Sequence, residues 1–291
     1  MTMLIDPPQT RRVRTGDGRV PDPQPQRADD SAGRRGLITL STTSVLPQGV
    51  GKTFEIAAEL GYGGIEVMPT LADPSSWTLR HLRKLRDRYS IPVTSVHAPC
   101  LGPQTAGVWG WNPWTKLEHS VTVAEELGAG VVVVHPPFWW QRDYAATFVE
   151  TLAEMQGRTN VRIAVENLYR RRLFDYRPGW NLDEPRWATL DVSHAAASGD
   201  DVVTMAKTMA KPTADRLTHV HFSDSATGRD LHMVPGRGEQ RCGELLKHLA
   251  QVGYAGDICI EVNTSTVGPF ERRRRLAEAR AFVELHWPSL R

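Results

Sequence analysis

Histidine and acidic residues gather in one stretch of the sequence, from Leu217 to Gly238. A short apolar run there ends on His221, and Asp230 and His232 follow before a Pro-Gly-Arg-Gly turn. This density favours a divalent metal, since His and Asp supply the nitrogen and oxygen donors that zinc and manganese take. Taken alone, the stretch is equally compatible with a solvated loop whose side chains hydrogen-bond to water.

Titratable residues also end most of the other apolar runs of the chain, at Glu66, His97, His135, Glu166, Asp191, His221 and Glu261. One polar residue at the end of a strand often only caps the sheet. Seven that converge would repel or desolvate one another without a cation. His219 lies on the same face as His221, and we expect it to be a hydrogen-bonded core histidine.

Three further donors lie close to these strand ends: His194, Asp230 and His232. The candidate metal ligands are then His97, His135, Glu166, Asp191, His194, His221, Asp230, His232 and Glu261. Nine donors exceed what one ion can use. They predict either two or three metal ions, or one ion held by about four donors with the others left for substrate.

Eight short runs rich in valine, isoleucine and leucine predict the strands that position these residues: Leu37–Leu40, Gly64–Met68, Pro92–Val96, Val131–Val134, Val161–Val165, Ala188–Leu190, Leu217–Val220 and Asp257–Ile260. Runs without polar alternation indicate strands that are buried on both faces, and therefore a parallel sheet. Helices are predicted between them at Lys52–Leu60, Leu79–Tyr89, Thr115–Leu127, Asp143–Met155, Asp201–Met209, Gly243–Val252 and Glu271–Leu285. The helix expected after the fifth strand, within 168–185, is only poorly indicated by the sequence.

Eight alternating strand and helix units predict an α/β fold, a (β/α)8 TIM barrel, with a doubly wound open sheet as the alternative. In a TIM barrel the active site lies at the carboxyl ends of the strands, so the candidate ligands would meet at one rim. One other motif, Gly49–Thr53, resembles the end of a phosphate-binding loop, but Leu46 stands where the first glycine is required. We interpret it as the start of a helix.

Composition limits the remaining possibilities. The chain has 291 residues, and we expect a disordered, proline- and arginine-rich tail at 1–35 followed by the barrel domain at 36–291. The net charge of +2 gives no overall field that favours nucleic acid. The three cysteines contain no Cys-x-x-Cys pair, which predicts a reduced, cytoplasmic protein. The chain has no apolar run of roughly 20 residues and no apolar leader, so we expect no membrane partner and no secretory signal.

The strand-end segments, in their order, resemble the xylose isomerase-like TIM-barrel superfamily. They are Val-His-Ala-Pro, Val-His-Pro-Pro, Val-Glu-Asn-Leu, Leu-Asp-Val-Ser-His, His-Phe-Ser-Asp, Asp-Leu-His and Ile-Glu-Val-Asn, between about Gly36 and Leu285. This superfamily joins sugar and sugar-phosphate isomerases and epimerases to endonuclease IV, the zinc-dependent abasic-site nuclease. The isomerase branch implies one Mn²⁺, Mg²⁺ or Co²⁺ held by Glu166, Asp191, His221 and Glu261. The endonuclease branch implies three zinc ions bound by all nine candidate ligands.

The first functional hypothesis is a metal-dependent isomerase or epimerase of a small sugar or sugar phosphate. The metal would stabilise an enediolate, while Glu166 and Glu261 would remove and return the proton as general base and acid. The predicted substrate contacts are His194 and Arg237 for hydroxyl or phosphate groups, and Trp109 and Trp111 for an apolar wall against the sugar.

The alternative is a zinc-dependent phosphodiesterase that acts on abasic DNA, in which the metals would generate hydroxide and hold the attacking and leaving oxygens. The full set of donors favours it. Against it, Cys100 stands where the endonuclease family typically carries a tyrosine, and the predicted mouth is rich in tryptophan. We therefore rank the isomerase first. A non-enzymatic binding module, the third class, would require the metals to be absent.

Overall fold

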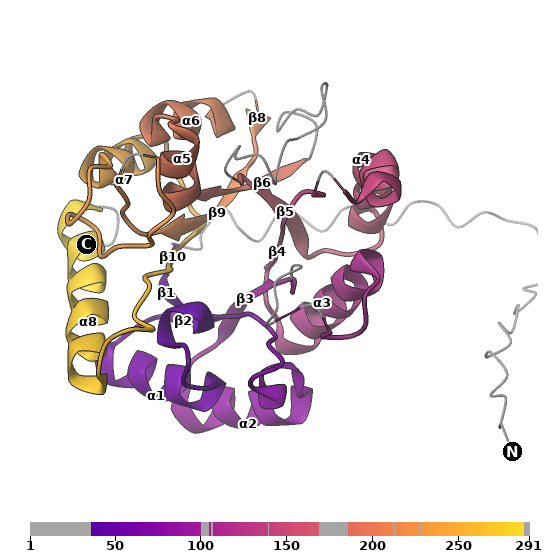
Figure 1. The fold of residues 1–291 in the computed structure, drawn as a ribbon, viewed down its shortest axis with the longest axis horizontal. Coiled ribbons are helices and arrows are strands. Elements are labelled where there is room, and N and C mark those ends of the chain that lie inside the picture. Colours follow the sequence, from indigo (N-terminus) through magenta and orange to yellow (C-terminus); the bar gives the residue numbers. More distant parts are fainter. Residues whose placement is uncertain are drawn as a thin grey trace, which may run out of the picture. The chain divides into compact units, whose positions relative to one another are not determined.

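Eight parallel strands close into a barrel in the order β1-β10-β9-β6-β5-β4-β3-β2 (Figure 1). The computed structural model describes residues 36–99, 105, 107–138, 140–168, 186–211, 214–226 and 228–287. The barrel strands are β1 (Ile38–Ser41), β2 (Gly64–Val67), β3 (Val93–His97), β4 (Val131–Val134), β5 (Arg162–Glu166), β6 (Trp187–Asp191), β9 (Leu217–Phe222) and β10 (Asp257–Ile260). The prediction of a TIM barrel is confirmed, and the open sheet is wrong.

Helices follow the strands and surround the barrel (Figure 1). Seven of them match the predicted segments: α1 (Val50–Leu60), α2 (Leu79–Tyr89), α3 (Pro113–Leu127), α4 (Arg142–Gln156), α6 (Val202–Met209), α7 (Cys242–Gln251) and α8 (Pro269–His286). The motif at Gly49–Thr53 starts α1, as we expected. Gly61 and Gly128 end α1 and α3 with φ of 76° and 75°, a left-handed conformation that glycine adopts without steric cost.

The structure adds short elements that the hydrophobic pattern did not predict. They are α5 (Val192–Ser198), the 3-10 helices η1 (Thr42–Val45) and η2 (Pro74–Trp77), and a two-stranded antiparallel ribbon of β7 (Ala210–Lys211) and β8 (Ala214–Asp215). Helix α5 is too short and too rich in alanine to show a helical period. It begins because the Asp191 carboxylate accepts a hydrogen bond from the His194 backbone N–H at 2.6 Å.

The apolar core lies between the barrel strands and the helices, and the strands are buried along nearly their whole length. This burial on both faces explains the unbroken valine and isoleucine runs of the sequence. Among the described helices, none is both long enough and apolar enough to cross a membrane. The predicted tail at 1–35 and most of the segment at 168–185 lie outside the described residues.

Candidate metal centre

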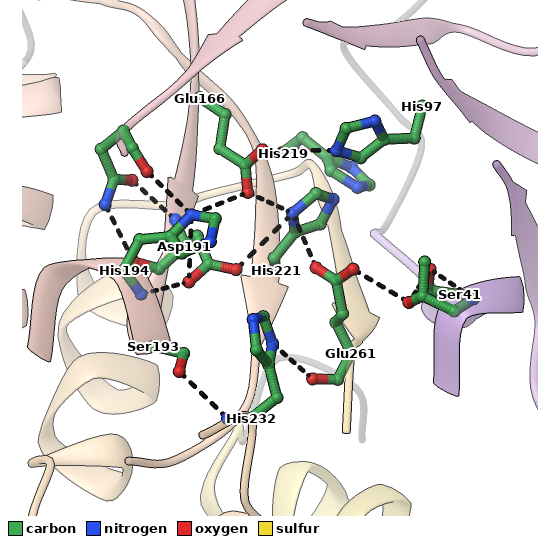
Figure 2. Close-up of polar contacts among 12 residues, drawn as sticks. Ser41, His97, Glu166, Asp191, Ser193, His194, His219, His221, His232 and Glu261 are labelled. Carbon is green, nitrogen blue, oxygen red and sulfur yellow. Dashed lines mark hydrogen bonds and ion pairs between the residues drawn. The ribbon is translucent and has the colours of Figure 1, made fainter. Parts of the chain in front are cut away.

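Four of the candidate ligands meet at the carboxyl ends of the strands, and we call them the central group: Glu166, Asp191, His221 and Glu261 (Figure 2). His221 Nδ1 lies 2.7 Å from Glu166 Oε1, 3.0 Å from Glu261 Oε2 and 3.7 Å from Asp191 Oδ2. The parallel pairing of β6 with β9 places Asp191 beside His221. Three carboxylates therefore surround one imidazole nitrogen.

The central group fits a divalent cation. Asp191 Oδ2 is buried and accepts no hydrogen bond from any described residue. Burial is the main cause that raises the pKa of Asp191, and the carboxylates of Glu166 and Glu261 raise it further. A cation among these groups would satisfy the orphaned oxygen and neutralise the like charges. Carboxylate oxygens with one imidazole nitrogen are a donor set that Mn²⁺, Mg²⁺ and Zn²⁺ accept.

Two histidines flank Glu166 on its other side, and we call them, with Glu166, the His97 group. His135 Nε2 lies 2.7 Å from Glu166 Oε2, and His97 Nε2 lies 3.3 Å from the same oxygen. Burial by itself raises the pKa of Glu166, but the imidazoles of His221 and His135 hold it well below its usual value. Glu166 is therefore ionised at neutral pH and has one oxygen facing each group.

A third cluster, the His232 group, consists of Asp191, His194 and His232, with Asp230 at its edge. His232 Nε2 lies 3.0 Å from Asp230 Oδ1, and His194 Nε2 lies 3.7 Å from Asp230 Oδ2. Burial lowers the pKa of both histidines, but the nearby carboxylates, Asp191 first, raise it to about 9 for His194 and about 10 for His232. His232 also has a φ of 45°, an uncommon conformation for a residue other than glycine, which often marks functional sites.

The structure thus brings all nine predicted metal ligands into three neighbouring groups. Glu166 belongs to both the central group and the His97 group, and Asp191 to both the central group and the His232 group. The assignment of the nine residues as metal ligands stays a prediction.

The other predicted substrate contacts, Arg237, Trp109 and Trp111, do not belong to these groups. Arg237 forms an ion pair with Glu278 of α8, with Nε 2.8 Å from Oε1. Trp109 packs against Trp77 and stacks on His119. Trp111 is 74% exposed. Cys100, which stands at the position of the endonuclease tyrosine, lies outside the described residues.

Several residues that support the centre were missed by the sequence analysis. The Thr43 hydroxyl donates to Glu261 Oε1 at 2.9 Å. Asn167 exchanges two hydrogen bonds with the backbone of Asp191, and Ser193 donates to Asp230 Oδ1 at 2.7 Å. Of these residues, only Asn167 carried a sequence signal, because it directly follows the strand-end Glu166.

The loop that carries Asp230 and His232 is organised around a buried carboxylate that was also missed. Asp224 accepts hydrogen bonds from four backbone N–H groups, those of Ser225, Gly236, Gly238 and Gln240, at 2.8 to 3.0 Å. A Cβ at position 238 would lie 2.4 Å from Asp224 Oδ1, so only glycine fits there. The Pro-Gly-Arg-Gly turn therefore wraps the carboxylate.

The comparisons with known proteins agree with this fold. An uncharacterized protein of Mycobacterium tuberculosis is 39% identical over 277 residues, which cover 86% of this chain and 97% of the relative. The fructoselysine 3-epimerase of Escherichia coli O157:H7 is 23% identical over 247 residues, 72% of this chain and 84% of the enzyme.

Solved structures show the same barrel. A D-tagatose 3-epimerase-like protein superposes with a TM-score of 0.64 at 21% identity, covering 86% of this chain and 98% of the other. A D-allulose 3-epimerase from Methylomonas sp. in complex with D-allulose gives 0.63 at 17% identity, with 87% and 98% covered. Residues 54–285 match the family described as xylose isomerase-like TIM barrel. The chain belongs to this family of xylose isomerase-like TIM barrels.

Proposed function

We propose that the chain is a divalent-metal-dependent isomerase or epimerase that moves a proton on a small sugar or sugar phosphate. The observation that carries this proposal is the central group, in which Glu166 and Glu261 approach His221 Nδ1 from different strands. Similar proteins that are named fructoselysine 3-epimerase, D-tagatose 3-epimerase-like protein and D-allulose 3-epimerase support it. The sequence identity to each is low, so their substrates are a guide to the substrate class only.

In this proposal Glu166, Asp191, His221 and Glu261 would hold one cation, which would supply charge stabilisation to a substrate carbonyl and the oxygen next to it. Glu166 and Glu261 then remove and return the proton. The side chain of Glu261 is 14% exposed and that of Glu166 only 1%. Glu261 is thus the more accessible of the two, and Thr43 fixes its orientation.

His194 is the substrate contact that the geometry supports best. Its Nδ1 lies 3.0 Å from the Asn167 carbonyl oxygen, so that this nitrogen donates there and Nε2 is directed to the other side. The side chain remains 10% exposed at the centre. Arg237, in contrast, is held by Glu278. We therefore propose that His194, rather than Arg237, binds a substrate hydroxyl.

The second candidate function is hydrolysis of a phosphodiester by three zinc ions. The observation that favours it is the presence of the His97 and His232 groups on either side of the central group. Three cations held there would activate water and hold the attacking and leaving oxygens. Abasic DNA is the substrate that this alternative implies.

Metal content and activity, measured together on the purified protein, test the choice. The isomerase predicts one exchangeable Mn²⁺, Mg²⁺ or Co²⁺ per chain and epimerisation of a ketose such as D-allulose, without nicking of abasic DNA. Three zinc ions with nicking would overturn it. His232→Gln is the discriminating variant: it leaves the central group intact, so epimerisation persists, whereas a three-zinc nuclease loses one of its ions.

A further inference from the structure

A fourth carboxylate near His221, that of Glu66 on β2, lies on the side of the ring that faces away from the central group. It is fully buried, and its Oε2 accepts hydrogen bonds from Ser95 Oγ and His219 Nε2, each at 2.9 Å. His221 Nε2 lies 3.0 Å from Glu66 Oε1 and 3.2 Å from Oε2. His219 and His221 both reach it because residues two apart on β9 point to the same side of the strand.

The two nitrogens of His221 therefore face carboxylates on opposite sides of the ring. Nδ1 faces Glu166 and Glu261, and Nε2 faces Glu66. A neutral imidazole carries one proton, and a metal can bind only the nitrogen that lacks it. The acceptor on the far nitrogen consequently decides which nitrogen is offered to the cation.

We propose that Glu66 is a positioning residue that keeps the proton of His221 on Nε2 and thereby presents the Nδ1 lone pair to the cation. This inference rests on the proposed function, because it concerns the same centre. Without the carboxylate, the Nε2–H group would be buried beside no acceptor of comparable strength. The proton would then favour Nδ1, where Glu166 and Glu261 accept it and compete with the cation.

The same residues allow another interpretation, in which they bind a cation themselves. Glu66, His219, His221 and Cys259 each offer a donor atom within 4.8 Å of the others. The separations of 2.9 to 3.2 Å between Glu66 Oε2 and the two histidine nitrogens are lengths of N–H···O hydrogen bonds. The Ser95 hydroxyl donates to the same oxygen. Three donors that converge on one carboxylate oxygen favour the hydrogen-bonded arrangement.

The variant Glu66→Gln tests the proposal because it preserves the shape of the side chain and removes its charge. We expect the affinity for Zn²⁺, measured by isothermal titration calorimetry on the full chain, to fall about 10- to 100-fold. Ser95→Ala is the matched control: it removes one hydrogen bond to Glu66 but leaves the contact with His221, so its affinity stays close to wild type. Equal affinities of Glu66→Gln and wild type would overturn the proposal.

Nitrogen-15 NMR of labelled histidines in the zinc-loaded wild type gives a readout that does not depend on a variant's folding. We expect His221 to carry its proton on Nε2. A proton on Nδ1 would overturn the proposal. So would a second cation bound at Nε2, which Co²⁺ would reveal through a thiolate absorption band that Cys259→Ser abolishes.

The outcomes for this inference and for the proposed function can be told apart. A wild type that binds no divalent cation at the central group overturns both. A wild type that binds one cation and epimerises a ketose, together with a Glu66→Gln variant that binds it equally well, overturns the positioning role alone.

Discussion

Cation binding at the central group should release protons, because the carboxylates around His221 favour its protonated form when no cation is bound. Burial lowers the pKa of His221, but the carboxylates of Glu66, Glu261 and Glu166 hold it well above its usual value. A cation that binds Nδ1 must displace the proton that this nitrogen carries in the protonated form of His221. We therefore expect at least one proton released per cation at neutral pH, and an affinity that rises about tenfold per pH unit.

The number of protons released also distinguishes a chain that binds one cation from a chain that binds three. His194 and His232, with pKa values of about 9 and about 10, are almost fully protonated at neutral pH. A further cation in the His232 group would therefore release about two more protons. The double variant His194→Gln/His232→Gln is the control, because it removes these two protons and leaves the proton of His221.

Isothermal titration calorimetry in buffers of equal pH but different ionisation enthalpies measures this number directly. The observed binding enthalpy changes with the ionisation enthalpy of the buffer, and the slope is the number of protons released. A slope of zero for the first equivalent, with an affinity that is flat between pH 6 and pH 8, would refute the proposed displacement at His221.

Four further predictions concern catalysis, stability and the N-terminal segment. Glu261→Gln should lower kcat by about 10²- to 10⁴-fold with an unchanged melting temperature, and a variant of wild-type activity would make Glu261 a scaffold residue. Asp224→Ala leaves four backbone N–H groups without their acceptor. At about 1 kcal/mol for each hydrogen bond, the free energy of unfolding measured by urea titration should fall by about 4 kcal/mol. An unchanged free energy of unfolding would mean that water replaces the carboxylate. Without cation, the melting temperature should fall as the pH rises from about 7 to 10. The reason is that the folded-state pKa values of His194 and His232 lie above the unfolded value of about 6.5, so both residues lose their stabilising charge over this range. A melting temperature that rises with pH would contradict these pKa shifts. Deletion of residues 1–35 should leave activity and melting temperature nearly unchanged, and a large loss of either would show that this segment contributes to the barrel.

The barrel could be predicted because its strands are buried on both faces. Runs such as Val131–Val134 stand out from the sequence, and a glycine often closes the helix before the next run. Helix α5 could not be predicted, because it is seven residues long and contains three alanines. Its start depends on a hydrogen bond between Asp191 and the His194 backbone, which the sequence pattern does not reveal.

The set of residues at the centre could also be predicted from the sequence, because the parallel strands of a barrel end at one rim. The contacts between individual atoms could not be predicted. The position of Glu66 behind His221 depends on the register of β2 and β9, which are separated by β1 and β10 in the barrel. The role of Asp224 depends on the path of a loop. Trp109 is another example, because aromatic residues in a loop give no indication of whether they face substrate or pack together.

The most direct test of the account is an anomalous-difference map at the manganese absorption edge, from crystals of the full chain grown with Mn²⁺. We expect a peak bonded to Glu166, Asp191, His221 Nδ1 and Glu261. No peak there under saturating Mn²⁺, or manganese bound only elsewhere on the chain, would contradict it.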